Sequence, residues 1–373
     1  MKISLLLAES KILAGVYRAI LLFVIQIFRV QRPFRSGTRR TVIINFHRLG
    51  DSVFTIPAIR EVLKHINNDI YIFCFEETKP IFETLPNNVS IISFSKSDFH
   101  LNLRLAGSSV RKKLKEINPE RIVDITGSTL SASVLISATA KDIIGSNEFY
   151  YKDLYTRFTR LRTEPHVMDI YLDTVRLMTP DIDESIRRFA TTKNKNGYLL
   201  IHPFAGWKAK EWNIIRFIEL AEKLNERYRT IIVAEPGKIN PEIKQEIILK
   251  DIEVIEPHNI NELMKVIDNC SLFISNDSGP LYIASMLGKP TFTLYGPTNP
   301  VFSLPFGKNH RFIQKEIKCS PQPNEQYCFT NAGRIGCPSF ECMISLGVDE
   351  VFDSLSQFIN ELGIYHKKTA QRA

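Results

Sequence analysis

Short apolar runs alternate with longer amphipathic stretches from about residue 41 onward. A run of about four to eight apolar residues is typical of a buried β-strand, whereas an apolar residue every three to four positions is typical of a helix. In the first half, this pattern predicts strands at 41–46, 70–75, 89–94, 121–125 and 142–144, and helices at 56–66, 103–117, 130–138 and 164–178. In the second half it predicts strands at 198–203, 230–234, 253–255, 272–274 and 291–295, and helices at 212–228, 280–287 and 348–362. Strands that alternate with helices indicate an α/β fold with mostly parallel sheets.

The length of the chain, 373 residues, favours two domains. The polar stretch 181–197, which ends in TTKNKNG, separates the two halves of the pattern and marks the expected boundary. We therefore expect an N-terminal domain over 37–185 and a C-terminal domain over 195–373, facing each other across a cleft. Hydrophobic residues make up 44% of the chain, so a sizeable core is available and folding requires neither disulfides nor a metal.

The stretch 272–300 has a clear strand–loop–helix–strand pattern with small and polar residues in its loop. Its sequence is LFISNDSGPLYIASMLGKPTFTLYGPTNP. An apolar strand ends at the polar cluster NDSG, 276–279, and Pro280 then suits the first position of a helix, where its missing N–H is not needed. The helix is expected to stop at Gly288-Lys289-Pro290, before a second strand. Ligands of open α/β sheets bind at such strand ends, and the amides of a helix start favour an anion such as a pyrophosphate. An ordinary, well-capped strand–helix turn remains the alternative.

The loop expected after the first strand, 47–55, places Gly50 and Asp51 at the end of that strand. A carboxylate in this position faces the expected cleft and can act as a general base, which typically accelerates a reaction ~10²–10⁴-fold. By position alone, however, a capping role for Asp51 at the next helix is favoured.

The corresponding loop of the second half, 203–212, carries Lys208 and Lys210 near the start of a helix. A lysine in such a loop can neutralise a pyrophosphate. The alternative is a pair of solvated surface lysines.

The N-terminal segment 1–36 is apolar and basic. The first forty residues hold eight lysines and arginines against the single acidic residue Glu9, a net charge of +7 out of +8 for the whole chain. The rest of the chain is therefore close to neutral, which argues against a broad nucleic-acid-binding surface.

The cleanest apolar run of this segment, 19–28, is about half the length that a membrane-spanning helix needs, and no cleavage site typical of a signal peptide follows. We expect an amphipathic helix that lies on an anionic membrane surface; a tilted single-span anchor and a helix packed on the body are the alternatives.

The six cysteines fall into two groups. Cys74 and Cys270 lie in apolar surroundings and are expected to be buried small hydrophobes. The other four are separated by eight, eight and four residues: Cys319, Cys328, Cys337 and Cys342. Zinc sites usually contain Cys pairs with two to four residues between them, and only the last interval fits. We therefore expect no metal, and keep a site made by these four thiols as the less favoured alternative.

Four motifs in this sequence resemble glycosyltransferase family 9, the heptosyltransferases of lipopolysaccharide core biosynthesis. INFHRLGDSVFTIPAIREV resembles the opening motif of the family, and HPFAGWKAKEWNIIRFIELAEKL its donor-side loop and helix. SNDSGPLYIASMLGKPTFTLYGPTNP resembles its nucleotide-sugar motif, and CFTNAGRIGCPSFECMISLGVDEV its cysteine-containing ending. The motifs occur in the family's order and together cover about residues 41–362.

The resemblance implies a GT-B fold with two Rossmann-like domains and an inverting, metal-independent sugar transfer in the bacterial cytoplasm, at the inner membrane. Asp51 matches the family's proposed catalytic base, and His47, Arg48 and Gly50 belong to the same acceptor-side loop. On the donor side, the matching and neighbouring positions are Lys208, Lys210, Asp277, Ser278, Gly279 and Tyr282. No cofactor is implied. The donor is expected to be an ADP-linked sugar, heptose by resemblance, and the acceptor a glycolipid. Because the Asp277 carboxylate would repel phosphate, we expect it to contact sugar or ribose hydroxyls.

One position departs from the family. Many members carry a histidine three residues after the Asp-Thr/Ser-Gly motif, where this chain has Tyr282; a tyrosine donates one hydrogen bond but does not become cationic near pH 7. The departure puts the heptose donor, or the usual donor contacts, in question. Two other functions therefore stay open: a catalytically silent sugar-nucleotide-binding homologue in glycan assembly, and a GT-B-type nucleotide-sugar epimerase.

Overall fold

The computed structural model describes residues 19–20, 23, 38–101, 104–136, 138–146, 151–160, 162, 166–192, 194–328, 337 and 339–365. The expected amphipathic segment 1–36 lies outside these residues, apart from 19–20 and 23. Within the described part of the chain, no helix combines the length and the apolarity that a bilayer crossing requires.

The chain divides into two compact units. The first comprises Met1–Arg162 and Met168–Asp183, and the second comprises Thr163–Val167 and Glu184–Ala373. The chain crosses between the units three times, and the last crossing, after Asp183, falls inside the polar stretch 181–197.

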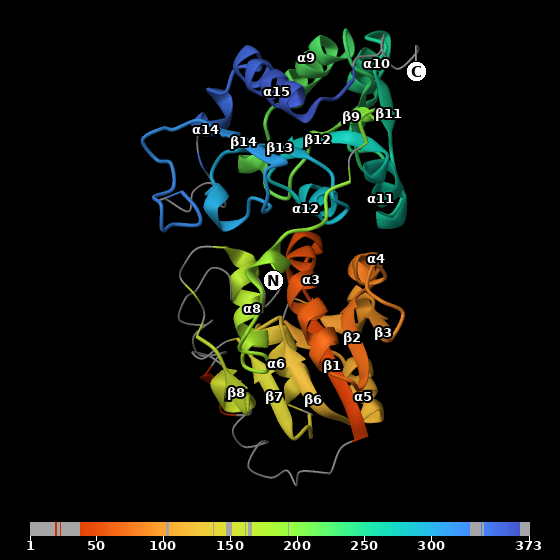
Figure 1. Ribbon diagram of the computed structural model, residues 1–373, viewed down its shortest axis with the longest axis vertical. Helices are drawn as coiled ribbons and strands as arrows, with labels where there is room; N and C mark the ends of the chain where they lie inside the picture. Colours follow the sequence, from red (N-terminus) through yellow and green to blue (C-terminus); the bar gives the residue numbers. More distant parts are fainter. Residues whose placement is uncertain are drawn as a thin grey trace, which may run out of the picture. The chain divides into compact units, whose positions relative to one another are not determined.

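A six-stranded, fully parallel sheet forms the centre of the first unit, with the strand order β3-β2-β1-β6-β7-β8 (Figure 1). Its strands are β1 Thr38–Asn45, β2 Asp69–Phe75, β3 Val89–Phe94, β6 Pro119–Asp124, β7 Asp142–Gly145 and β8 Arg157–Phe158. The helices are α3 Leu49–His65, α4 Lys79–Phe82, α5 Ser108–Ile117, α6 Thr129–Leu135 and α8 Val167–Arg176. With the earliest strand in the middle and the order reversing beside it, this is the Rossmann arrangement.

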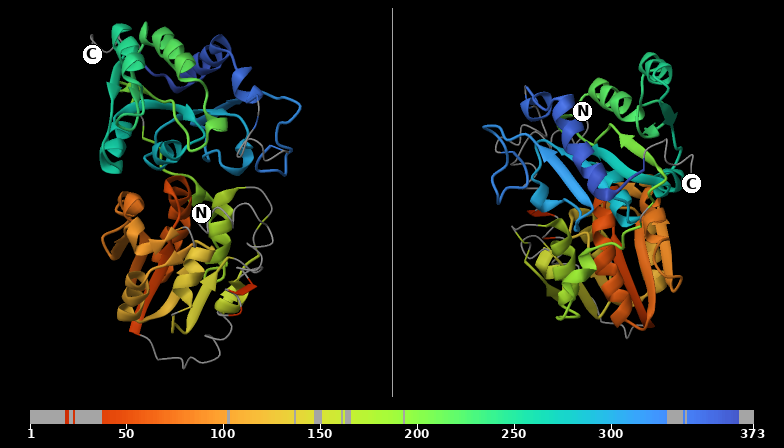
Figure 2. Two further views of the ribbon diagram at one scale, coloured as in Figure 1. Left: turned by 180° about the vertical axis from the view of Figure 1, so that it is seen from behind. Right: turned by 45° about the horizontal axis from the view of Figure 1, so that its top comes forward.

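Helices cover both faces of this sheet, as Figure 2 shows from two further directions. The middle strand β1 is therefore buried from Thr41 to Asn45. Its Val42 and Ile44 pack in the core that α5 and α6 complete, and the intervening Ile43 faces the opposite side of the sheet. A strand buried on both faces reads as a continuous apolar run, which is why the pattern located it.

The second unit repeats the arrangement, with the parallel order β11-β10-β9-β12-β13-β14. Its strands are β9 Tyr198–His202, β10 Thr230–Val233, β11 Glu253–Ile255, β12 Cys270–Asn276, β13 Thr291–Tyr295 and β14 His310–Gln314. The helices are α9 Ile214–Asn225, α10 Pro241–Leu249, α11 Ile260–Asp268, α12 Gly279–Met286, α14 Glu341–Ile344 and α15 Val348–Leu362. In Figure 1, α9 and α15 lie on one side of the sheet and α12 on the other.

The helix α12 ends as the sequence predicted. Its C-cap is Leu287, and Gly288 adopts φ +75°, the left-handed conformation that glycine reaches without steric cost. A Cβ at Gly288 would also lie 2.1 Å from the Ala190 carbonyl oxygen, so both the conformation and the close approach require glycine. The strand that follows occupies Thr291–Tyr295, as predicted.

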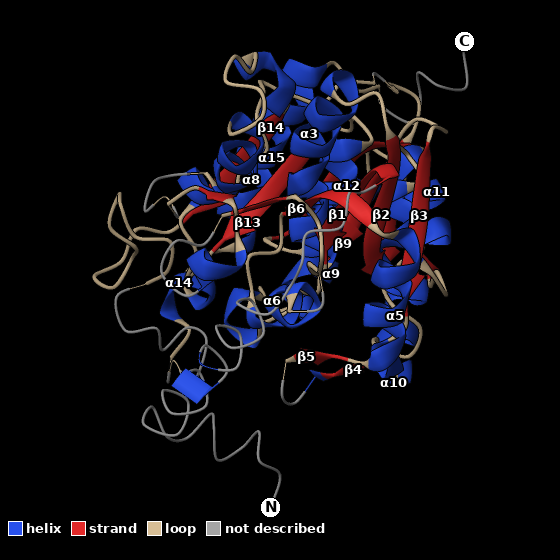
Figure 3. Ribbon diagram, turned by 90° about the horizontal axis from the view of Figure 1, so that it is seen from below, coloured by secondary structure: helices blue, strands red, loops and turns tan. Residues whose placement is uncertain are grey.

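The sequence predictions differ from the structure in several places, and the helices α10 and α11 are among the elements that were not predicted. The helix expected at 56–66 begins at Leu49, because Leu49, Gly50 and Asp51 form its first turn directly after a three-residue link. The helix expected at 103–117 begins at Ser108, because Leu105–Ala106 (β5) instead pairs with Phe99–His100 (β4). Figure 3 shows this short pair apart from the larger sheets. The edge strand β14 was missed altogether, since its sequence HRFIQ is largely polar.

Candidate functional site

Two loops meet at the carboxyl ends of β9 and β12, neighbouring strands in the middle of the second sheet. The buried Asn276 side chain ties them together: its Oδ1 accepts the Trp212 amide at 3.0 Å, and its Nδ2 donates to the Pro203 carbonyl at 2.8 Å. The strand order reverses between β9 and β12, and open α/β sheets bind ligands at that switch point. The structure thus brings together the two stretches 203–212 and 276–279 that the sequence singled out.

Asp277 lies buried at this junction with both carboxylate oxygens engaged. Its Oδ2 accepts from Lys210 Nζ at 2.5 Å and from Thr298 Oγ1 at 2.8 Å, and its Oδ1 accepts the hydroxyl of Tyr282. Burial alone would raise the pKa of Asp277, but the Lys210 charge and the three hydrogen bonds outweigh it and lower the pKa. Asp277 is therefore ionised and holds Lys210 in place. Its expected contact with a sugar or ribose hydroxyl stays a prediction.

Lys210 is fixed from a second direction by an aromatic ring. Its Nζ lies 4.4 Å from the ring centroid of Trp207, which in turn contacts the ring of Tyr327 at 5.3 Å. The side chain of Lys210 is 16% exposed. An ammonium group carries three N–H donors, so this cation retains donor capacity toward a ligand while its position is held by Asp277 and Trp207.

Lys208, the other predicted donor-side lysine, differs from Lys210 in its exposure and in its ion-pair partner. Both lysines belong to the short 3₁₀ turn Lys208–Lys210, but Lys208 is 81% exposed and pairs with Glu211 Oε2 at 3.0 Å. The structure therefore does not bring Lys208 to Asp277.

Ser278 and Gly279 form the start of α12. Ser278 is the N-cap, yet its hydroxyl makes no capping hydrogen bond, and its buried Oγ has no hydrogen-bond partner among the described residues. A buried hydroxyl without a protein partner has hydrogen-bonding capacity left, so Ser278 Oγ is available to a ligand. The first-turn amides carry the positive end of the helix dipole, which suits an anion.

Tyr282 faces Asp277 from inside α12 and is neutral. Burial, followed by the neighbouring Asp277 charge, raises the pKa of Tyr282 well above its usual range. The pKa of Tyr295 is raised in the same way, by burial and by the charge of Asp277. The Asp277 carboxylate is thus paired with one cation, Lys210, and with neutral hydroxyls.

In the first unit, Asp51 lies in the first turn of α3 and is partly exposed. The capping role that its position favoured is wrong: the N-cap is Arg48, and the helix start has no side-chain cap. Among the described residues the Asp51 carboxylate has no hydrogen-bond or ion-pair partner, so it remains available as a proton acceptor.

The neighbours of Asp51 have separate roles. His47 Nε2 donates to the Ile125 carbonyl at 3.1 Å, and its ring packs edge-on against Tyr171. Arg48 is exposed, and Gly50 is the second residue of α3. His47 therefore fixes the link between β1 and α3, which ends at Arg48 and precedes the helical turn that carries Asp51.

Three residues of the donor-side junction were missed as site residues. Thr298, in the turn after β13, contacts Asp277; Trp207 contacts Lys210; and Asn276 joins the two loops. Thr298 and Asn276 both occur inside the stretch 272–300, but only as turn-forming residues in the sequence pattern. Their roles depend on partners 21 and 64 residues away, respectively, which local patterns do not reveal.

The chemistry of this junction suits an anion. A held lysine, a helix start and an unsatisfied serine hydroxyl together provide positive charge and hydrogen-bond donors. As the side chains stand, no group of three or more His, Cys, Asp or Glu residues in the described ranges is arranged to hold a metal ion. A diphosphate-bearing ligand fits these groups.

Comparison with known proteins shows the family to which the chain belongs. The family profile described as "Glycosyltransferase family 9 (heptosyltransferase)" matches residues 108–332, more than half of the chain. The chain is 24% identical over 335 residues to lipooligosaccharide heptosyltransferase 2 of Campylobacter jejuni, covering 83% of this chain and 96% of that relative.

Solved structures share the fold. A family 9 glycosyltransferase from Veillonella parvula superposes with a TM-score of 0.69 at 18% identity, over 87% of this chain and 98% of that one. The ADP-heptose heptosyltransferase II of E. coli superposes with a TM-score of 0.67 at 17% identity, over 86% and 99%. The expected GT-B fold, built from two Rossmann-like domains, is confirmed. The chain belongs to glycosyltransferase family 9, the heptosyltransferase family, and is a glycosyltransferase.

Proposed function

We propose that this protein transfers heptose from an ADP-linked donor to a lipopolysaccharide-core or related glycolipid acceptor, with inversion at the transferred sugar and without a catalytic metal. The observation that carries the proposal is the Lys210–Asp277 pair beside the start of α12, with the unpartnered Ser278 hydroxyl. Support for the sugar and the acceptor comes from the relatives, which are named as lipooligosaccharide and ADP-heptose heptosyltransferases.

In this mechanism the acceptor hydroxyl oxygen attacks the anomeric carbon as the bond to the diphosphate breaks. The bonding electrons leave with the diphosphate, and the hydroxyl proton passes to Asp51. Negative charge therefore develops on the leaving group, where Lys210 and the α12 amides stabilise it. Because Asp277 and Trp207 already hold the Lys210 ammonium, little reorganisation is needed during the reaction.

Tyr282 gives the donor site a different charge from one that contains a histidine. Its hydroxyl is directed to Asp277 and stays neutral, so the single cation recorded beside Asp277 in the described chain is Lys210. We propose that phosphate recognition rests on Lys210 and the helix start, and that Tyr282 fixes Asp277.

The Asp51→Asn variant tests the reaction, because the amide keeps the shape of the carboxylate but accepts no proton. We expect turnover with ADP-heptose and a core glycolipid to fall ~10²–10⁴-fold while ADP affinity is unchanged. Unchanged turnover would exclude Asp51 as the base. A wild-type protein that binds ADP without transfer would instead favour the silent homologue, and conversion of the nucleotide sugar without acceptor would favour an epimerase.

Matched lysine variants test the donor site. Lys210→Met is expected to weaken ADP binding at least tenfold, since it removes the held cation, whereas Lys208→Met removes a cation that is solvated and paired elsewhere. Isothermal titration with ADP, UDP and GDP measures both the effect and the preferred base. Equal losses in the two variants would contradict the assignment, and a preference for UDP or GDP would replace the donor.

The N-terminal segment 1–36 is proposed to hold the enzyme on the cytoplasmic face of the inner membrane, where a glycolipid acceptor is accessible. Its apolar run and its positive charge support the proposal. Deletion of 1–36 should abolish co-sedimentation with anionic vesicles at low salt. Equal sedimentation of the full-length and truncated proteins would show that this segment is not the attachment site.

A further inference from the structure

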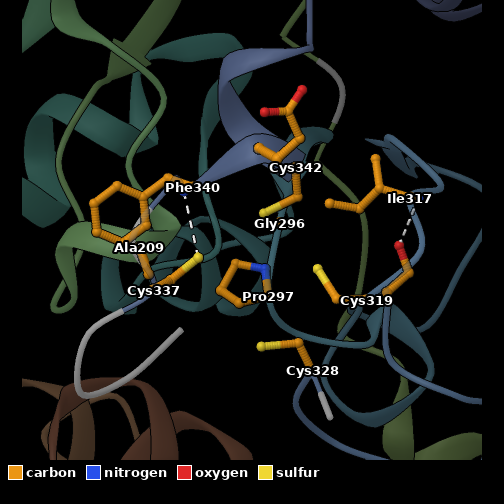
Figure 4. A pocket seen from close by; sticks show the side chains of 11 residues that line it. Ala209, Gly296, Pro297, Ile317, Cys319, Cys328, Cys337, Phe340 and Cys342 are labelled. Atoms are coloured by element: carbon orange, nitrogen blue, oxygen red, sulfur yellow. Dashed lines mark hydrogen bonds between the residues drawn. The ribbon is translucent and has the colours of Figure 1, made fainter. Parts of the chain in front are cut away.

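Four cysteines that are not adjacent in the sequence lie around one small pocket of the second unit. Cys319, Cys328, Cys337 and Cys342 all line it, together with Gly296, Pro297 and Ala209. Figure 4 shows the four sulfur atoms directed toward a common space beside Pro297. Their sequence spacing had made a metal site the less favoured alternative, because only the last interval comes close to the Cys pairs of zinc sites.

Main-chain contacts hold these segments against the turn after β13. The Cys328 amide donates to the Pro297 carbonyl at 2.8 Å, and Thr298 and Tyr327 form an antiparallel bridge. On the other side, a Cβ on Gly296 would lie 3.3 Å from Cys342 Sγ and 2.5 Å from Met343 Sδ. The absence of a side chain at Gly296 therefore lets the Cys342 segment approach the backbone beneath the thiols.

The surroundings of the thiols suit sulfur ligands. The Phe340 amide donates to Cys337 Sγ at 3.3 Å, with Phe340 in the left-handed conformation, φ 48°. An N–H that points at a sulfur stabilises its ionised, metal-binding form. Burial, together with the three other thiols nearby, raises the pKa of Cys342 to about 11, so without a metal this thiol is protonated.

The pocket that these cysteines help to line has a volume of about 20 Å³. That is room for one particle about the size of a water molecule and too little for an organic ligand. The sulfurs do not yet form a ligand set, since no three such side chains in the described ranges are arranged to hold an ion as they stand. A cysteine sulfur moves by rotation about one side-chain bond, and we expect ligation to draw the four sulfurs together from their present places around the pocket.

We propose that Cys319, Cys328, Cys337 and Cys342 together bind one thiophilic divalent metal ion, of which zinc is the representative, in a structural tetrathiolate site. On binding, four S–H groups release four protons to solvent and four sulfur–metal bonds form, with no change in oxidation state. Four thiolate ligands suit tetrahedral zinc or iron, and a fully occupied tetrahedron leaves no position for substrate. The site is therefore separate from the sugar-transfer chemistry and does not depend on it.

The position of the site gives it a structural consequence. The thiol-bearing loop is bonded to Pro297 and Thr298, and Thr298 donates to Asp277, which holds Lys210. A bound ion would cross-link this loop to the Cys342 segment and so stabilise the wall of the Lys210 site.

The test uses the full-length protein, purified and kept fully reduced without oxygen, with Co²⁺ as the spectroscopic probe. We expect the absorption bands of tetrahedral cobalt–thiolate to saturate at one Co²⁺ per chain and to disappear when Zn²⁺ is added. Elemental analysis of the protein as purified should find about one zinc or iron per chain. Failure of the wild-type protein to bind either ion would overturn the proposal, as would a thiol titration showing these cysteines paired in disulfides.

Paired variants separate these thiols from the other two. Cys319→Ala with Cys342→Ala should abolish the cobalt bands, whereas Cys74→Ala with Cys270→Ala, which alters the two fully buried strand cysteines, should retain them. Retention of the bands in the first variant would contradict the assignment. If that variant does not fold, the cobalt titration of the wild-type protein still shows whether one metal ion binds per chain.

Discussion

The ion pair between Lys210 and Asp277 allows a quantitative test of the donor-side junction. Asp277→Asn removes the negative charge but keeps the shape, which leaves the largely buried Lys210 ammonium without its partner. Lys210→Met does the converse, and of the recorded donors within the described ranges it leaves the Asp277 carboxylate with Thr298 and Tyr282. Removing one partner of a buried pair typically costs about 3–5 kcal/mol. Because Lys210 is 16% exposed, we expect the lower limit, about 3 kcal/mol of unfolding free energy, for each variant.

The double variant is predicted to be far less destabilised than the sum of the two. Replacing both charges removes the pair without leaving an uncompensated ion, so the double variant should lose about 3 kcal/mol rather than about 6. The coupling energy is then about 3 kcal/mol. Lys208→Met is the matched control, and its exposed pair with Glu211 should contribute no more than about 1 kcal/mol.

Tryptophan fluorescence during urea unfolding is a suitable assay. The chain contains two tryptophans, Trp207 and Trp212, and both lie in the loop that carries Lys210. The signal therefore reports on the second unit, while far-UV circular dichroism follows both units and shows whether they unfold together. Single-variant losses that add within about 0.5 kcal/mol, or that each stay below about 1 kcal/mol, would refute the claim that the buried pair organises the site.

Two further predictions concern stability. Gly288→Ala should cost about 3 kcal/mol of unfolding free energy, measured by urea titration, because it combines left-handed strain with a clash against the Ala190 carbonyl. The control Gly237→Ala, at φ +74° with open space around it, should cost only the strain, about 1–2 kcal/mol. Equal losses in the two variants would contradict the steric argument. Burial lowers the pKa of His202 from 6.5 to about 4. As the pH falls, the His202 imidazole is therefore protonated in the unfolded chain before it is protonated in the folded one. The unfolding free energy should then decrease between about pH 6.5 and 4, by up to ~1.4 kcal/mol per pH unit. His202→Gln should reduce this slope in urea midpoints measured across that range, and an unchanged slope would show that His202 does not cause it.

The sequence by itself determined the elements whose signals are local. Short runs rich in apolar residues located β3, β11 and β13 to the residue, and a helical stripe did the same for α15. Gly288 marked the end of α12, because left-handed backbone is a property of single residues. Recognition of the family also followed from local motifs, since the loops at strand ends keep their residue types close together in the chain.

Only the tertiary structure decided which of these residues act together. Thr298 and Lys210 reach Asp277 from 21 and 67 residues away, and the four C-terminal cysteines come to line one pocket beside Pro297. The mostly polar strand β14 exists because β13 offers it a ladder of hydrogen bonds, and the start of α5 shifted because β5 pairs with β4. Hydrophobic periodicity reports which face of an element is buried. It contains no information about the partner that buries it, and in this protein the site chemistry depends on those partners.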